Sequence, residues 1–278
     1  MFPSTTRRSF FGATAAAFAA SRAGSGAAAP EPGDLKLGIA SYSFREFSRK
    51  LAIEDAQKLN VAYINIKDVH LPLGSTPDEI AKARAEFTKA GLTIVGGGNI
   101  SFQKDDEADI RSKFEYAKLA GMPLIVCAPT HETLPKMEKY VKEYNIKLAL
   151  HNHGPEDKHF PTPQSVLDAT KGMDPRCGLC MDIGHTARTG VDIVEWIRRA
   201  GPRLLDMHVK DLKSASEKGS QCPVGEGVLP IVAIFKELKH MNYQGYVNLE
   251  YEIEADNPVP GMQKSFAYMR GVLAGLRG

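Results

Sequence analysis

The sequence predicts an α/β protein with a single (β/α)8 barrel, the TIM-barrel fold, over residues 30–278. Eight short runs with the composition of β-strands alternate with helical stretches, and about 250 residues suit eight such units. No linker or low-complexity block divides this part of the chain. Several runs are continuously apolar, as strands covered on both faces require.

The strands are assigned to short apolar runs between turn-forming residues. Leu124–Ala128 is the clearest case, because five apolar residues in succession suit a strand that is buried on both faces. The eight predicted strands are Leu37–Ser43, Val61–Ile66, Leu92–Gly97, Pro123–Ala128, Lys147–His151, Gly178–Asp182, Leu204–Val209 and Tyr246–Tyr251.

Three of the predicted helices end directly before a glycine. Gly91, Gly121 and Gly201 follow the last periodic residue, where a left-handed cap needs no Cβ. An open doubly wound sheet is the alternative fold, but residues 39–44 lack the G-x-G-x-x-G loop that would favour it. The predicted helices are Ile53–Leu59, Pro77–Ala90, Glu107–Ala120, Glu132–Tyr144, Pro163–Lys171, Val191–Ala200, Leu229–His240 and Met262–Leu276.

Residues 1–29 have the features of an export signal. Thr6-Arg7-Arg8-Ser9-Phe10-Phe11 resembles the twin-arginine motif, an Ala-rich apolar stretch follows, and Ala27–Ala29 offers a cleavage site. That stretch is too short for a membrane span, which takes roughly 20 apolar residues. The resemblance implies export of the folded protein by the twin-arginine translocation machinery, a periplasmic location and no stable membrane association afterwards. A frayed N-terminal helix is the alternative.

The charge balance excludes several classes of partner. The chain has 35 Lys and Arg residues against 33 Asp and Glu, a formal charge of +2. Residues 1–29 hold three arginines and no acidic residue, so removing these three positive charges from +2 leaves −1 for the remainder. A nearly neutral body gives no electrostatic reason to expect nucleic acid or an acidic membrane as a partner.

The four cysteines do not form a convincing redox or zinc motif. Cys177 and Cys180 fall in a predicted strand, where three extended steps separate their Cα atoms by about 10 Å, too far for a disulfide. No second pair completes a zinc site, since the others are the isolated Cys127 and Cys222. We therefore expect buried, unpaired cysteines.

Metal-ligand residue types end four consecutive predicted strands. Reactive residues of such barrels project from the C-terminal strand ends, so these side chains are expected to converge. A mixture of imidazole and carboxylate suits Mn²⁺, Zn²⁺, Co²⁺ or Fe²⁺ better than Mg²⁺. The four stretches are His151-Asn152-His153, Met181-Asp182-Ile183-Gly184-His185, His208-Val209-Lys210-Asp211 and Glu250-Tyr251-Glu252.

The first three of these stretches, together with Val224-Gly225-Glu226-Gly227, resemble the xylose isomerase-like sugar phosphate isomerase/epimerase superfamily. The resemblance covers nearly all of the chain after residue 29. It implies one divalent ion, most commonly Mn²⁺, with Zn²⁺, Co²⁺ and Fe²⁺ as alternatives. Carried over position by position, the implied ligands are His151, Asp182, His208 and Glu250.

His151 departs from the superfamily pattern, which usually has a glutamate at the end of strand five. Two-base epimerases of this superfamily are thought to use the glutamates of strands five and eight. A ligating His151 cannot also be a base, so a one-base proton transfer, giving isomerisation or elimination next to a carbonyl, fits better. We assign the base to Glu250, with Glu252 as the alternative, because both point to one side of an extended strand.

Further candidates lie at the same rim of the predicted barrel. Lys210 shares a strand face with His208 and is expected to stabilise an oxyanion or donate a proton, unless it is a solvated surface lysine. Gly96–Gly98 would leave room for a sugar ring or form a simple turn, and the polar segment Asp211–Val228 has the length of a lid. Trp196 is expected in the core. Expected substrate-binding residues are Lys67, His70, His153, His185 and Glu226, with orientation of the metal ligands as the alternative role of His153 and His185.

The leading functional hypothesis is a periplasmic, metal-dependent isomerase or epimerase-like enzyme acting through an enediolate. Export argues for an unphosphorylated sugar or keto-sugar, a small-molecule carbohydrate partner. A lyase that eliminates the leaving group from 3-keto-glycosides needs the same metal and base and is the second hypothesis. A non-catalytic sugar- or metal-binding barrel is the third. A phosphodiester-cleaving endonuclease is disfavoured, because the chain lacks a basic surface and additional metal ligands.

Overall fold

The computed structural model describes Met1 and residues 33–277 of the chain. The predicted signal peptide therefore lies outside the described residues, apart from Met1. Within residues 33–277, no helix combines the length and the apolar character needed to cross a membrane.

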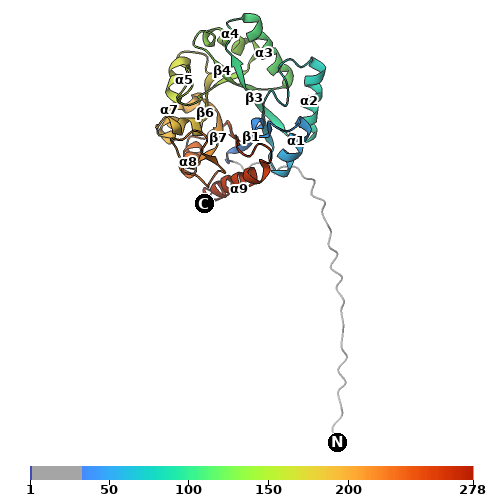
Figure 1. Cartoon of the computed structure of the whole chain (residues 1–278), viewed down its shortest axis with the longest axis vertical. Helices are drawn as coiled ribbons and strands as arrows, with labels where there is room; N and C mark the ends of the chain where they lie inside the picture. Colours follow the sequence, from blue (N-terminus) through green and yellow to red (C-terminus); the bar gives the residue numbers. More distant parts are fainter. Residues whose placement is uncertain (2–32, 278) are drawn as a thin grey trace.

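Eight parallel strands close into a barrel in the order β1-β10-β7-β6-β5-β4-β3-β2. The helices form a ring around them (Figure 1), which confirms the predicted (β/α)8 barrel. Each predicted run overlaps one barrel strand. The strands are β1 Lys36–Ala40, β2 Tyr63–Ile66, β3 Thr93–Phe102, β4 Leu124–Pro129, β5 Lys147–His151, β6 Cys177–Asp182, β7 Leu204–Val209 and β10 Tyr246–Leu249.

Local capping signals mark the ends of several helices. Thr76 and Glu79 form a reciprocal capping box at the start of α2, and Gly121 ends α3 in the left-handed conformation with φ of 73°. The helices are α1 Arg49–Lys58, α2 Pro77–Lys89, α3 Glu107–Ala120, α4 Leu134–Tyr144, α5 Pro163–Thr170, α6 Ile183–Arg188, α7 Ile193–Ala200, α8 Ile231–His240 and α9 Val259–Gly275.

β1 and β3 depart most from their predicted extents. β1 ends at Ala40, and Ser41–Phe44 forms a 3-10 turn instead of continuing the strand. β3 runs through the three glycines to Phe102. A Cβ at Gly98 would lie 2.0 Å from the Val126 carbonyl oxygen, so the missing side chains let β3 approach β4. The expectation that Gly96–Gly98 leave room for a sugar ring is therefore wrong.

The cysteines and the tryptophan lie where the sequence analysis expected them. All four cysteines are unpaired and buried, and Trp196 packs in the hydrophobic core.

The interior of the barrel is polar below the C-terminal strand ends: Asn248 donates a 2.9 Å hydrogen bond to Asp206, and both side chains are buried. Burial raises the pKa of Asp206 to about 7.

Candidate metal centre and active site

Four predicted ligands meet at the C-terminal end of the barrel. His151 ends β5, Asp182 ends β6, His208 is the penultimate residue of β7, and Glu250 follows β10. These strands are neighbours in the barrel, so their ends lie side by side. One donor atom from each residue lies within 4.8 Å of all the others, and all four residues are buried. We call this group the four-ligand cluster.

The donor atoms of the four-ligand cluster point at one another. His151 Nε2 lies 3.2 Å from His208 Nδ1 and 3.5 Å from Asp182 Oδ2, and His208 Nδ1 lies 3.1 Å from Glu250 Oε2. Asp182 Oδ2 is buried and makes no hydrogen bond, although it forms an ion pair with Lys210 Nζ at 2.9 Å. Buried carboxylates that converge on one point need compensating positive charge, which a divalent cation would supply. Two imidazoles and two carboxylates therefore fit a divalent transition-metal ion.

Lys210 lies inside the cluster and is 3% exposed, which rules out the solvated surface lysine. Its Nζ is 2.9 Å from both Asp182 Oδ2 and Glu250 Oε2, and 2.5 Å from Glu252 Oε2. Burial alone would lower the pKa of Lys210, but the three carboxylates outweigh it and raise the pKa well above its usual range. A Cβ at Gly184 would meet Cγ and Cδ of Lys210 at 2.7 Å, so this glycine makes room for the aliphatic part of the lysine side chain.

Glu250 and Glu252 point to the same side, as predicted, because both bind Lys210. Burial would raise the pKa of Glu250, but the charges of His208 and Lys210 hold it well below its usual range. Burial raises the pKa of Glu252. Gln221 fixes the backbone of the pair: its amide donates to the Glu250 carbonyl at 2.7 Å and accepts from the Glu252 N–H at 2.9 Å.

Two further imidazoles stand beside His151. The His153 and His185 rings are 4.6 Å apart between centroids, and lie 5.4 and 5.7 Å from the His151 ring. Asp182 Oδ1 caps α6 by accepting from the His185 N–H at 2.8 Å. Burial lowers the pKa of His185 to about 3, so its ring is neutral at physiological pH.

A sequence model of the xylose isomerase-like TIM barrel family matches residues 53–272. The chain belongs to this family. Its eight parallel strands and the cluster at their C-terminal ends are therefore a xylose isomerase-like barrel with a candidate metal centre.

The proteins similar to this xylose isomerase-like barrel include named enzymes. An inosose dehydratase of Mesomycoplasma hyopneumoniae is 27% identical over 161 residues, 51% of this chain and 53% of the relative. The chain thus matches about half the length of this curated relative. The IolI protein with a bound zinc atom is 18% identical, with a TM-score of 0.73 and coverage of 87% and 99%. D-psicose 3-epimerase from Clostridium cellulolyticum, solved with D-tagatose, is 19% identical, with a TM-score of 0.71 and coverage of 86% and 99%. At these identities, the two structures show the shared fold alone.

Lys67 and His70, two of the predicted substrate-binding residues, contact other residues of the protein. Lys67 donates to the Asn99 carbonyl at 2.9 Å, at the rim beyond β2. His70 is buried, and its ring nitrogens contact Ser41 Oγ at 2.9 Å and the Phe44 carbonyl at 3.2 Å. The prediction that His70 binds substrate is therefore wrong, because the 3-10 turn engages both ring nitrogens and leaves neither for a substrate.

Glu226 pairs with a surface lysine and with no member of the four-ligand cluster. It is exposed, and its carboxylate lies 3.0 Å from the ammonium group of Lys264 in α9. The segment around it is held by Asp211, whose carboxylate accepts from the N–H groups of Gly225, Gly227 and Leu229. Two short antiparallel strands, β8 Asp211–Leu212 and β9 Gln221–Cys222, brace the same segment. This bonding does not favour the mobile lid expected for Asp211–Val228.

Several contributors to the site were not singled out from the sequence. Buried Asn152 accepts from the Asp182 N–H at 3.1 Å and donates to Thr186 at 3.0 Å, joining β5 to the start of α6. In the sequence, Asn152 stands between His151 and His153, and this position could have identified it as part of the site. Gln221 of β9 bonds the segment after β10, and Arg188 of α6 bonds Glu156 after β5; no local pattern indicates these long-range contacts.

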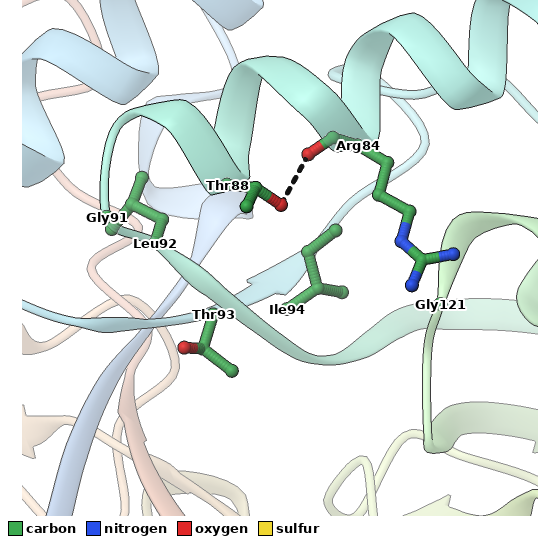
Figure 2. Close-up of a pocket in the computed structure, with 7 residues that line it drawn as sticks. All are labelled: Arg84, Thr88, Gly91, Leu92, Thr93, Ile94 and Gly121. Atoms are coloured by element: carbon green, nitrogen blue, oxygen red, sulfur yellow. Dashed lines mark hydrogen bonds between the residues drawn. The ribbon is translucent and has the colours of Figure 1, made fainter.

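A surface pocket at the other end of the barrel is separate from this centre (Figure 2). It surrounds the start of β3, whereas the four-ligand cluster lies at C-terminal strand ends. Inside it, Thr88 donates to the Arg84 carbonyl at 2.9 Å. The lining residues are Arg84, Thr88, Gly91, Leu92, Thr93, Ile94 and Gly121.

Proposed function

We propose that the protein is a divalent-metal-dependent isomerase or epimerase-like enzyme that moves a proton next to the carbonyl of an unphosphorylated sugar or keto-sugar. The observation that carries this proposal is the four-ligand cluster with Lys210 inside it, bonded to Glu250 and Glu252. Buried carboxylates, a buried ammonium and the neutral imidazole of His185 at one barrel end are groups suited to proton transfer at a carbon acid.

The metal would be held by His151 Nε2, Asp182 Oδ2, His208 Nδ1 and Glu250 Oε2. We propose Mn²⁺, with Zn²⁺, Co²⁺ and Fe²⁺ as alternatives that the same donor set accepts. A bound divalent ion supplies Lewis-acid polarisation of a substrate carbonyl and its neighbouring hydroxyl. The convergence of two buried imidazoles and two buried carboxylates within 4.8 Å supports this assignment.

Glu250 is the proposed base. Its hydrogen bonds and ion pairs use Oε2, so Oε1 is available to take the proton from the carbon next to the carbonyl. Return of that proton to the former carbonyl carbon, together with transfer of the neighbouring hydroxyl's proton to the former carbonyl oxygen, completes an isomerisation. Lys210 stays protonated and stabilises negative charge on the substrate oxygen. Glu252 is the alternative base, since it reaches Lys210 without belonging to the four-ligand cluster.

Elimination is the second candidate function, and one feature favours it. Both candidate bases, Glu250 and Glu252, follow β10, whereas β5 ends in His151, which is an imidazole and not a carboxylate. A base on one side suits removal of a proton followed by departure of a group from the next carbon. The substrate would then be a 3-keto-glycoside, and the relation to an enzyme named inosose dehydratase supports the reaction class.

Export through the twin-arginine pathway to the periplasm is part of the proposal, and rests on Thr6–Phe11. It supports a carbohydrate without phosphate, because sugar phosphates are cytoplasmic metabolites.

Metal content and deuterium exchange test the proposal together. Full-length protein, matured through export, is expected to hold about one equivalent of metal, which His151→Ala with His208→Ala should remove. Arg84→Ala, at the opposite barrel end, is the matched control and should keep it. In deuterium oxide, an isomerase returns labelled keto-sugar, whereas a lyase releases the leaving group from a 3-keto-glycoside. Protein that contains no metal and refuses added Mn²⁺ and Zn²⁺ would refute the mechanism.

A further inference from the structure

Arg188 contacts the imidazole of His185 directly. Both residues belong to α6, and Nη2 of Arg188 lies 3.0 Å from Nδ1 of His185. The Arg188 side chain is only 7% exposed, so the protein holds the guanidinium in place.

Two residues of the loop after β5 shape this contact. Glu156 receives both ends of the guanidinium, at 2.6 and 2.8 Å, which is the bidentate geometry of a strong arginine–carboxylate pair. Gly154 has φ of +86°, and a Cβ there would lie 2.5 Å from Arg188 Nη2 and 3.3 Å from His185 Nδ1. A side chain at position 154 would therefore displace the arginine from the histidine.

The chemistry of the two groups determines where the His185 proton lies. A guanidinium has donors only and stays protonated, so it cannot accept a hydrogen bond from an imidazole N–H. Nδ1 of His185 must therefore be the acceptor and carry no proton. In a neutral ring, the proton is then on Nε2.

We propose that Arg188 is a positioning residue that fixes His185 as the neutral Nε2–H tautomer, so that the ring presents a hydrogen-bond donor to a substrate oxygen. Among the described residues, none forms a hydrogen bond with His185 Nε2. The ring packs near the imidazoles of His151 and His153 and contacts the Arg188 guanidinium. A donor selects an oxygen that carries or gains negative charge, such as a carbonyl or the oxyanion formed from it.

The donor role rests on the proposed function, whereas the tautomer is a property of the protein alone. The two can therefore fail separately. The tautomer is measured without any substrate, and the donor role is measured by turnover.

Nitrogen chemical shifts of the imidazole rings report the tautomer. The full chain, labelled with ¹⁵N-histidine, is examined with and without diamagnetic Zn²⁺, and His185→Asn assigns the His185 signals among eight histidines. We expect a protonated Nε2 and a bare Nδ1 in the wild type. An Nδ1–H tautomer or an imidazolium in the wild type would overturn the proposal, and this result needs no variant to fold.

Variants at Arg188 test whether this residue sets the tautomer. Arg188→Ala should move both nitrogen shifts toward an average of the two tautomers. The double exchange of Arg188→Glu with Glu156→Arg keeps an ion pair but puts an acceptor opposite Nδ1, so the proton should move to Nδ1. Arg111→Ala, which breaks an exposed Arg111–Glu143 pair, is the control and should change nothing. Unchanged His185 shifts in both Arg188 variants would overturn the assignment.

Two substitutions at His185 separate the donor from the contact with Arg188. The amide oxygen that His185→Asn introduces can still accept from Arg188, but this shorter side chain offers no group near the position of Nε2. His185→Gln, in contrast, places an amide donor near that position. We expect His185→Asn to lower kcat about tenfold more than His185→Gln, the size of one hydrogen bond lost in the transition state. Equal kcat values would overturn the donor role even if the tautomer is as expected.

Discussion

Lys210 and Glu250 are 40 positions apart in the chain, yet Lys210 Nζ lies 2.9 Å from Glu250 Oε2 at the C-terminal end of the parallel barrel. The same ammonium binds Asp182 and Glu252, so one positive charge faces three buried or partly buried carboxylates. Lys210, together with His208, offsets the repulsion among these acids.

Removing that charge should destabilise the protein in a way that metal reverses. Lys210→Met is expected to cost roughly 3–5 kcal/mol of the free energy of unfolding, the range for breaking a buried ion pair. Added Zn²⁺ or Mn²⁺ should restore part of it, because a cation that binds only the folded state stabilises that state. Urea denaturation with and without metal measures both effects.

Lys142 provides the control for this change. It pairs with Glu138 on the outer surface at 2.8 Å and is 54% exposed. Lys142→Met should change stability by less than about 1 kcal/mol, with no response to metal. Equal losses in the two variants would contradict the role of Lys210 as a counter-charge.

Glutamine substitutions distinguish the two candidate bases. Glu250→Gln should lose both metal and turnover, because its carboxylate belongs to the four-ligand cluster. Glu252→Gln should keep the metal and, if Glu250 is the base, retain turnover within about tenfold. Metal analysis and exchange of substrate protons in deuterium oxide measure the two properties. A Glu252→Gln variant that keeps its metal and exchanges no proton would move the base from Glu250 to Glu252.

The barrel and its four-ligand cluster could be predicted from the sequence because their signals are local. Apolar runs such as Leu124–Ala128 mark buried strands, and parallel strands bring their C-terminal ends together. The four strand ends that carry ligand-type residues therefore converge, and the resemblance to the superfamily singled out His151, Asp182, His208 and Glu250 among them.

Features that depend on packing between elements were not predictable in this way. α6 escaped notice because Asp182 is both the last residue of β6 and the N-cap of the helix. His70 looked like a rim residue, but the unexpected 3-10 turn at Ser41–Phe44 captures its ring. The length of β3 depends on how closely Gly98 approaches β4, which composition does not reveal.

Gln221 should matter for turnover more than for metal binding. Its side chain bonds the backbone of Glu250 and Glu252, so Gln221→Ala frees the segment that carries both carboxylates. We expect kcat to fall about tenfold, since small displacements of a positioned base are costly, with metal content unchanged. Gln164→Ala removes an exposed contact with Asp168 on α5 and is the control. Loss of metal in Gln221→Ala would show instead that this residue supports the four-ligand cluster.

His70 should make stability depend on pH below neutrality. Burial lowers the pKa of His70 from its usual value near 6.5, so the folded state binds its proton more weakly than the unfolded state does. His70 therefore destabilises the fold progressively as pH falls below about 6.5, with a slope of up to about 1.4 kcal/mol per pH unit, and has no such effect above it. His70→Asn cannot titrate, so its unfolding free energy should fall less steeply than that of the wild type between pH 6.5 and 5. Parallel pH dependences from urea denaturation would show that the ring is protonated equally in both states, contrary to its burial beneath Ser41–Phe44.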